Sequence, residues 1–254
     1  MLKNPYLVPG LERGLRLLQL FRPGRAEIGA PDIARELELP RSTAFRLLQT
    51  LEVLEFVERC ANGAFRLGPA VLRLGIEFVA SQDVGDYGRE MVEKLCQETG
   101  ASSQIAIRDG RELVVVLKKN PTATFVSNVQ VGTRMPAHAT VLGRVLLQDV
   151  DLRKLYPEGK LKQFTPHTPK SVAELERLIA QDRMRGYAVS ESAYESGISA
   201  VAVPVRNHEQ RVVAALSVIV SQPKLEAKRR DELIHKAVAA ATELSRRMSY
   251  REAA

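Results

Sequence analysis

Two short amphipathic segments, separated by a proline break within residues 31–52, constrain the fold of this chain more than any other feature. The second segment begins near Arg41, and its apolar residues recur at helical spacing, which predicts a buried face made of Ala44, Leu47, Leu48, Leu51 and Leu54. The polar residues on the opposite side are Ser42, Thr43, Arg46 and Gln49, and Arg41 at the start of the segment is a further candidate for DNA contact. Short hydroxyls can reach phosphates and an arginine can reach a base edge. This side therefore suits a helix that lies in the major groove of DNA.

Three helices are predicted in the first part of the chain. The first covers residues 11–21, with a buried stripe expected from Leu11, Leu15, Leu18 and Phe21. The second begins around Pro31, which a first helical turn tolerates because the missing N–H has no helical partner there. It ends before Pro40, since the residue that precedes a proline disfavours helical dihedral angles.

A β-hairpin is predicted directly after these helices, with strands at residues 56–59 and 64–67. The Asn-Gly pair between the strands tolerates positive φ at both positions, which is a strong signal for a tight turn. Three helices and a hairpin make a winged helix-turn-helix. Residues of the wing expected at the sugar-phosphate backbone are Arg59, Asn62 and Arg66.

Helix pairs of this kind also occur in domains that bind no nucleic acid, and an arginine on an exposed helix is often simply solvated. Here no apolar residue covers the polar side of the third helix, which favours DNA binding. Phe45 could pack beneath the wing or touch a thymine methyl group, and we expect it to pack.

Composition sets wide bounds. The 254 residues suffice for one large domain or two ordinary ones, and the net charge of +7 is compatible with nucleic acid without showing where it would bind. Cys60 and Cys96 lie far apart and the histidines are scattered, so no metal site and no cofactor are predicted. No leader and no bilayer-spanning apolar run is recognised, which predicts a cytoplasmic protein without a membrane partner.

The remainder of the chain mixes strand and helix patterns. We expect a DNA-binding domain at residues 1–68, a linker helix at 69–82 and a second domain at 83–254. Strands of the second domain are predicted at residues 103–108, 113–118, 124–129, 198–205 and 212–221. Its helices are predicted at residues 87–99, 139–148, 172–185 with Ser171 as the cap and Gly186 as the stop, and 225–248. Hairpins with helices grouped around them predict the α+β class, with an antiparallel sheet and flanking helices.

These segments resemble the IclR family of bacterial transcription regulators over nearly the whole chain. The resemblance rests on the order and spacing of ERGL at 12–15, IARELELPRSTAFRLLQTL at 33–51, FRLG at 65–68, VGTRMPAHAT at 131–140, GRVLL at 143–147, TPHT at 165–168, GYAV at 186–189 and GISAVAVPV at 197–205. It implies a winged helix-turn-helix followed by a GAF-like effector domain, assembled as a homodimer or homotetramer. GLERGL at 10–15 and GTRMP at 132–136 are most similar to the branch that controls aromatic-acid catabolism of the protocatechuate and hydroxybenzoate kind.

The resemblance also implies a pocket for a small organic acid. The pocket residues it implies are Val141, Leu142, Ser190, Ile198, Ala200, Ser217 and Ile219. Arg134 and His138 lie just before the pocket helix, and Arg134 is our candidate partner for a carboxylate. Three departures bear on the ligand: bulky Val141 and Leu142 replace small residues, Glu191-Ser192 replaces an acidic pair, and residues 207–210 form a turn without the usual glycine.

The function these features indicate is a ligand-responsive DNA-binding regulator of a catabolic operon that senses a small organic, and specifically aromatic, acid. The alternative is an enzyme for such an acid fused to a DNA-binding module. That alternative needs a nucleophile with its base, a phosphate loop or a metal cluster, and none of the corresponding motifs is present, so we expect no enzyme. A protein-interaction adaptor that uses the second domain alone is a third possibility.

Overall fold

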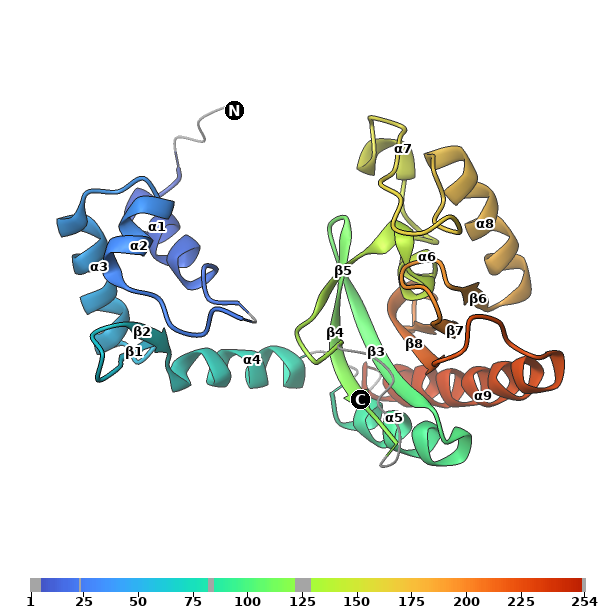
Figure 1. The fold of residues 1–254 in the computed structure, drawn as a ribbon. Helices are drawn as coiled ribbons and strands as arrows, with labels where there is room; N and C mark the ends of the chain where they lie inside the picture. The colour runs from blue at the N-terminus through green and yellow to red at the C-terminus, as the bar shows by residue number, and fades with distance from the viewer. Residues whose placement is uncertain (1–5, 23, 82–84, 122–128, 253–254) are drawn as a thin grey trace. The chain divides into compact units, whose positions relative to one another are not determined.

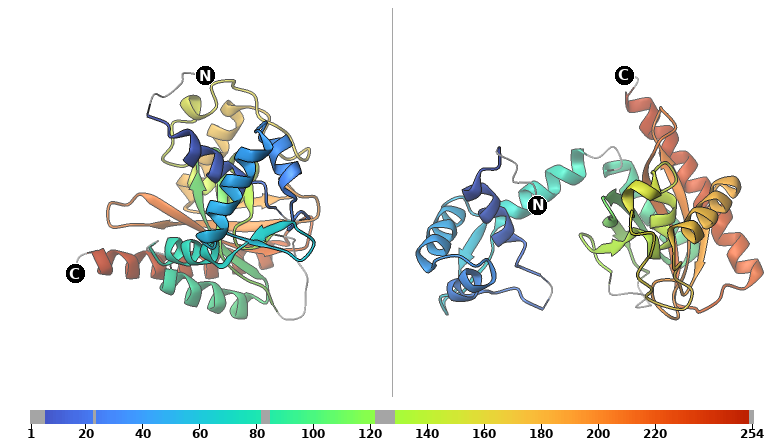
Figure 2. Two further views of the ribbon diagram at one scale, coloured as in Figure 1. Left: turned by 90° about the vertical axis from the view of Figure 1, so that its left-hand side faces the viewer. Right: turned by 90° about the horizontal axis from the view of Figure 1, so that it is seen from above.

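The computed structural model describes residues 6–22, 24–81, 85–121 and 129–252. They belong to two compact units, Met1–Ser81 and Gln82–Ala254. Figures 1 and 2 show a small helical unit with a short hairpin and a larger unit built around a sheet.

The first unit has the predicted winged helix-turn-helix architecture. Its elements are α1 (Pro9–Leu18), α2 (Ala30–Glu36), α3 (Arg41–Val53), β1 (Val57–Arg59), β2 (Phe65–Leu67) and α4 (Pro69–Ser81). Pro40 is the extended N-cap residue of α3, so the break falls where the proline predicted it. Gly63 adopts φ +81 in the turn between β1 and β2, a conformation that favours glycine.

The core of the first unit lies between α1, α2, α3 and the hairpin, and includes Leu17, Ile33, Leu48 and Phe65. The predicted stripe on α1 is wrong in part, because Leu11 and Leu15 are 62% and 53% exposed. Residues 11–21 carry leucines on two neighbouring faces, so periodicity could not show which face turns inward. Leu54, expected in the core, is also exposed, because it follows the last turn of α3.

The second unit is an antiparallel sheet flanked by helices, as the sequence predicted. In the described residues its strands follow the order β5-β4-β3-β8-β7-β6. The strands are β3 (Ser102–Asp109), β4 (Glu112–Lys119), β5 (Arg134–Pro136), β6 (Ala188–Glu191), β7 (Ser199–Arg206) and β8 (Val212–Val220). The helices are α5 (Gly85–Thr99), α6 (Val141–Leu146), α7 (Leu152–Leu155), α8 (Val172–Arg185) and α9 (Ala227–Glu252), with a 3-10 turn η1 (Ala137–Ala139).

Helices cover both faces of this sheet. α5 and α9 pack on each other and against strands β3, β4 and β7, while α6 packs against β7 and β8 and is backed by α8 (Figures 1 and 2). Residues 201–203 and 214–218 are therefore buried at consecutive positions. This explains why β7 and β8 appear in the sequence as continuous apolar runs rather than as alternating patterns.

Local signals explain several boundaries. The Ser171 hydroxyl accepts a hydrogen bond from the Glu174 N–H at the start of α8, and Gly186 ends that helix at φ +79. The helix predicted at 139–148 is shorter, because a 3-10 turn precedes it. In the turn at 207–210, where the family usually has glycine, Gln210 adopts φ +61. Of the predicted strand 124–129, only residue 129 belongs to the described part of the chain.

Candidate nucleic-acid interface and ligand pocket

The outward side of α3 carries two arginines. Arg41, Ser42 and Arg46 are exposed, whereas Thr43 and Gln49 are half-buried. No carboxylate lies within ion-pair distance of the Arg41 or Arg46 guanidinium in the part of the chain that the structure describes. These two side chains are therefore available to phosphates or base edges without first breaking an ion pair.

Phe45 differs from its expected position. Its side chain is 48% exposed on the surface of α3 and does not pack beneath the wing. The core position there is taken by Phe65 of β2, which is buried and whose backbone pairs with Ile28. An exposed phenylalanine beside Arg46 is compatible with the other expectation for it, contact with a thymine methyl group.

The polar residues of the wing already have carboxylate partners. The Arg66 guanidinium lies 2.8 Å from Glu58, Arg59 lies 3.5 Å from Glu52, and the Asn62 amide donates to Glu27 at 2.9 Å. Gln49 of α3 also donates to the Glu52 carboxylate, at 2.8 Å. Exposed ion pairs contribute about 0–1 kcal/mol each, so a phosphate can displace these carboxylates at small cost.

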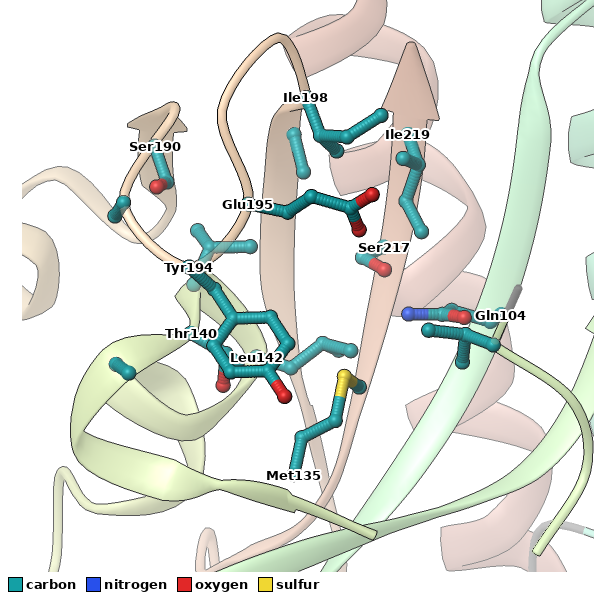
Figure 3. Close-up of a pocket in the computed structure, with 15 residues that line it drawn as sticks. Gln104, Met135, Thr140, Leu142, Ser190, Tyr194, Glu195, Ile198, Ser217 and Ile219 are labelled. Carbon is teal, nitrogen blue, oxygen red and sulfur yellow. The ribbon is translucent and has the colours of Figure 1, made fainter. Parts of the chain in front are cut away.

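A cavity of about 70 Å³ opens in the second unit between α6, the sheet and the loop that precedes β7 (Figure 3). It brings together predicted pocket residues from four elements and that loop, and these residues are Val141, Leu142, Ser190, Ile198, Ala200, Ser217 and Ile219. Its walls are mainly apolar, with a few polar groups, which is the usual character of a small-molecule site.

Other lining residues were not predicted, and they are Gln104, Val129, Met135, Ala139, Thr140, Ala193, Tyr194 and Glu195. Gln104 is the most informative of these because it lies directly opposite Ser217 on the neighbouring strand. A buried glutamine beside the apolar run at residues 105–107 was the available signal. The pairing of β3 with β8, which places it in the pocket, required the three-dimensional fold.

Two buried polar atoms of this pocket have no partner in the part of the chain that the structure describes. The Gln104 and Ser217 side chains are only 2% and 0% exposed, and neither Gln104 Oε1 nor Ser217 Oγ has a hydrogen-bond partner among the described residues. A buried polar group without a partner costs about 1–3 kcal/mol. In a cavity, a polar ligand or a water molecule can satisfy such atoms.

The structure corrects the expected charge partner. Arg134 lies on β5, where strand alternation turns the neighbouring Met135 into the pocket and Arg134 away from it. Its guanidinium contacts Asp109 at 2.6 Å and Glu112 at 2.8 Å instead. His138 also lies outside the lining, because the 3-10 turn directs its ring to the Lys162 carbonyl oxygen, 2.9 Å from Nε2. Among the described residues, Glu195 carries the one formal charge in the lining.

Two buried threonines, on the side away from the cavity, anchor the loop that precedes β7 and lines the pocket. The Thr165 hydroxyl donates to the Ser192 carbonyl oxygen at 2.7 Å, and the Thr168 hydroxyl donates to the Ala193 carbonyl oxygen at 2.5 Å. Tyr194 of this loop packs against Phe164, with ring centroids 5.1 Å apart. The TPHT segment therefore fixes the position of pocket residues without lining the pocket itself.

The pocket helix α6 is anchored by a buried ion pair on its other side. Arg144 Nε lies 2.8 Å from Asp182 Oδ2 of α8, and the guanidinium also donates to the Val189 carbonyl oxygen at 2.6 Å. Burial raises the pKa of Asp182, while Arg144 and Arg185 oppose that rise by stabilising the carboxylate. Gly143 is required beside it, because a Cβ atom at this position would lie 1.9 Å from the Ala137 carbonyl oxygen.

No group of three or more histidine, cysteine, aspartate or glutamate side chains is arranged to hold a metal ion in the described residues. No helix that the structure describes has both the length and the apolar character needed to cross a membrane.

A winged helix-turn-helix whose third helix exposes two arginines without carboxylate partners in the described residues, in one chain with a unit that contains a mainly apolar pocket, is typical of DNA-binding transcription regulators. The family model of the IclR helix-turn-helix domain matches residues 10–60, and that of the bacterial transcriptional regulator IclR C-terminal domain matches residues 76–246. The chain belongs to the IclR family.

Known members of the family are similar over most of their length. The HTH-type transcriptional regulator XynR of Escherichia coli is 35% identical over 215 residues, which cover 83% of this chain and 85% of XynR. The repressor AllR of Klebsiella pneumoniae is 29% identical, covering 82% of this chain and 78% of AllR. These relatives are transcription regulators.

Solved structures agree with the fold. An IclR regulator from Alicyclobacillus acidocaldarius matches with a TM-score of 0.84 and 28% identity, covering 96% of this chain and 99% of that one. An IclR homolog from Microbacterium hydrocarbonoxydans, complexed with 4-hydroxybenzoate, matches with a TM-score of 0.84 and 25% identity, covering 94% of this chain and 98% of that one.

Proposed function

We propose that this IclR-family regulator responds to a small organic acid, controls a catabolic operon, and reads its operator with the outward side of α3. The observation that carries the DNA part is the pair of exposed arginines, Arg41 and Arg46, without carboxylate partners in the described residues. An arginine in the major groove can donate two hydrogen bonds to guanine and so contribute sequence preference. The wing contributes phosphate contacts once its ion pairs open.

The ligand part rests on the pocket at α6. Met135, Leu142 and Ile198 supply apolar walls, and Gln104 and Ser217 leave buried polar atoms for a ligand to satisfy. The Microbacterium homolog binds 4-hydroxybenzoate, an aromatic acid. These two facts support an aromatic acid as the ligand, as in the family branch that controls aromatic-acid catabolism. Such a ligand would change operator affinity if it binds one of two arrangements of the protein more tightly than the other.

A second copy of the chain is the proposed protein partner, in a homodimer or homotetramer. Exposed leucines on two helices of the first unit support this proposal: Leu11 and Leu15 on α1, and Leu72 and Leu74 on α4. A two-fold arrangement would also present two α3 helices to half-sites about one helical turn apart. Sedimentation of the Leu11→Glu/Leu15→Glu variant checks it, with dissociation expected relative to wild type.

The relatives are named transcription regulators, and we propose no catalytic activity for this chain. An assay for loss of 4-hydroxybenzoate on incubation with the protein tests that statement, and loss beyond the buffer control would favour the fused-enzyme alternative.

Selection of operators from random duplexes, followed by anisotropy titration, tests DNA recognition. Arg46→Ala is expected to weaken binding by about 1–3 kcal/mol and to relax preference at one base pair. Arg153→Ala, a change of an exposed arginine in the second unit, is the charge-matched control and is expected to bind as wild type. Unchanged affinity and selectivity in Arg46→Ala would reject the assignment of α3 as the reading helix.

A further inference from the structure

Three polar residues lie side by side on neighbouring strands of the second unit. Gln104 of β3 is paired with Lys118 of β4 on one side and with Ser217 of β8 on the other. Directly opposed residues of antiparallel strands project from the same face, so this floor row of Lys118, Gln104 and Ser217 runs along the pocket side of the sheet. With strands about 4.8 Å apart, the row extends over roughly 10 Å.

Two members of the floor row need a ligand group that can both donate and accept. Gln104 Oε1 and Ser217 Oγ have no partner in the described part of the chain. The two ends of an amide can exchange places by a side-chain flip, so Gln104 can present either its carbonyl oxygen or its NH₂ group. A hydroxyl group satisfies either orientation and can share a hydrogen bond with Ser217 as well.

The third member is a cation without a carboxylate partner among the described residues. Lys118 is half-buried, and its Nζ donates to the carbonyl oxygen of Val129, a pocket-lining residue, at 2.5 Å. No carboxylate of the described residues lies within ion-pair distance of this ammonium, and residues 122–128 contain neither aspartate nor glutamate. Burial lowers the pKa of Lys118, as expected for an ammonium group without a neighbouring carboxylate. Arg134, by contrast, is neutralised by two carboxylates.

The opposite end of the pocket has the opposite charge. Figure 3 shows the Glu195 side chain reaching into the cavity on the side of Ser217, and no hydrogen bond or ion pair engages its carboxylate in the described residues. A carboxylate on the ligand would be repelled at this end, whereas a hydroxyl could donate to Glu195. Charge around the pocket is thus asymmetric: Glu195 belongs to the lining at one end, and Lys118 lies just outside the lining at the other, where its ammonium contacts the lining residue Val129.

We infer that the ligand is a hydroxy-carboxylic acid whose carboxylate is bound by Lys118 and whose hydroxyl is bound by Gln104 and Ser217. This inference rests on the proposed function, since it identifies the ligand of the same pocket. Lys118 exchanges the Val129 carbonyl for the ligand carboxylate, a charge-assisted bond that is stronger than the one it replaces. Aromatic and aliphatic hydroxy acids share this chemistry, and the apolar walls accept either skeleton.

Calorimetric titration with four probes tests the inference: 4-hydroxybenzoate, benzoate, 4-hydroxybenzamide and glycerate. Lys118→Met keeps the length of the side chain and removes its charge. It is expected to weaken the binding of the hydroxy acid by at least tenfold and to leave that of the neutral amide unchanged. Lys119→Met, at the adjacent exposed lysine, is the matched control and is expected to match wild type. Wild type should also prefer 4-hydroxybenzoate over benzoate, and Gln104→Met should remove that preference.

The outcomes separate this inference from the function it rests on. The inference is overturned if replacing 4-hydroxybenzoate by 4-hydroxybenzamide lowers the affinity of Lys118→Met by the same factor as that of wild type. It is also overturned if none of the four probes binds wild type. If a hydroxy acid binds through Lys118 but leaves operator affinity unchanged, the inference stands and the proposed ligand response fails. Melting temperatures no lower than that of wild type, and operator binding equal to it, in the absence of ligand confirm that all variants are folded.

Discussion

Filling the pocket from β8 should abolish ligand binding without unfolding the protein. Ser217→Leu adds three carbon atoms to a cavity of about 70 Å³ and removes a hydroxyl that has no partner in the described residues. Relief of the unsatisfied hydroxyl contributes about 1–3 kcal/mol of stability, whereas overpacking costs about 1–3 kcal/mol. The two effects nearly cancel, so the free energy of unfolding should stay within about 2 kcal/mol of wild type.

Ser217→Ala provides the matched comparison, because it removes the same hydroxyl but leaves the cavity open. Its free energy of unfolding should rise by up to about 1–3 kcal/mol. Its ligand affinity should fall through loss of one hydrogen bond, about 0.5–1.5 kcal/mol or roughly two- to tenfold.

Urea unfolding followed by circular dichroism gives the stability of both variants, and calorimetric titration with 4-hydroxybenzoate gives their affinities. Operator binding without ligand should match wild type in both. A normal ligand titration of Ser217→Leu would refute the placement of the pocket. A large loss of stability in Ser217→Ala would show instead that the hydroxyl is satisfied within the protein.

Three further changes test other parts of the account. Glu58→Gln releases Arg66 in the wing, so operator affinity should increase and the slope of log affinity against log salt should steepen by about one unit, as anisotropy at several salt concentrations would show. Arg144→Met leaves the Asp182 carboxylate buried with one arginine partner, so the free energy of unfolding should fall by somewhat less than about 3–5 kcal/mol. Adding Asp182→Leu should restore most of that loss in urea unfolding. No recovery in the double variant would contradict the assignment of the buried ion pair. Gly143→Ala should abolish 4-hydroxybenzoate binding or prevent folding, and a normal melting temperature with normal affinity would contradict the close approach seen here.

The fold was largely predictable, because its boundaries are marked by local chemistry. Pro40, the Asn-Gly turn, Ser171 and Gly186 act within a few residues of where they stand, so the elements they delimit were predicted closely. The buried face of α1 was not, because both of its candidate faces carry leucines. Phe45 was misplaced for a related reason, since periodicity does not show which aromatic residue enters the core.

The pocket was predictable only in part. Family resemblance predicted seven of its residues, namely Val141, Leu142, Ser190, Ile198, Ala200, Ser217 and Ile219. Arg134 and His138 were predicted there from their position just before the pocket helix. Strand alternation in β5 and the 3-10 turn direct those two side chains elsewhere. Gln104 reaches the pocket, and Lys118 the position beside it, through the register of β3 with β8 and with β4, a long-range arrangement that no local pattern contains.

Anisotropy titration of the selected operator, with and without saturating 4-hydroxybenzoate, tests most directly whether the pocket controls DNA binding. Wild type should change its operator affinity at least fivefold between the two conditions, a coupling of about 1 kcal/mol. Ser217→Leu should bind the operator equally in both. A ligand-dependent shift that persists unchanged in Ser217→Leu, or its absence from wild type, would contradict the account.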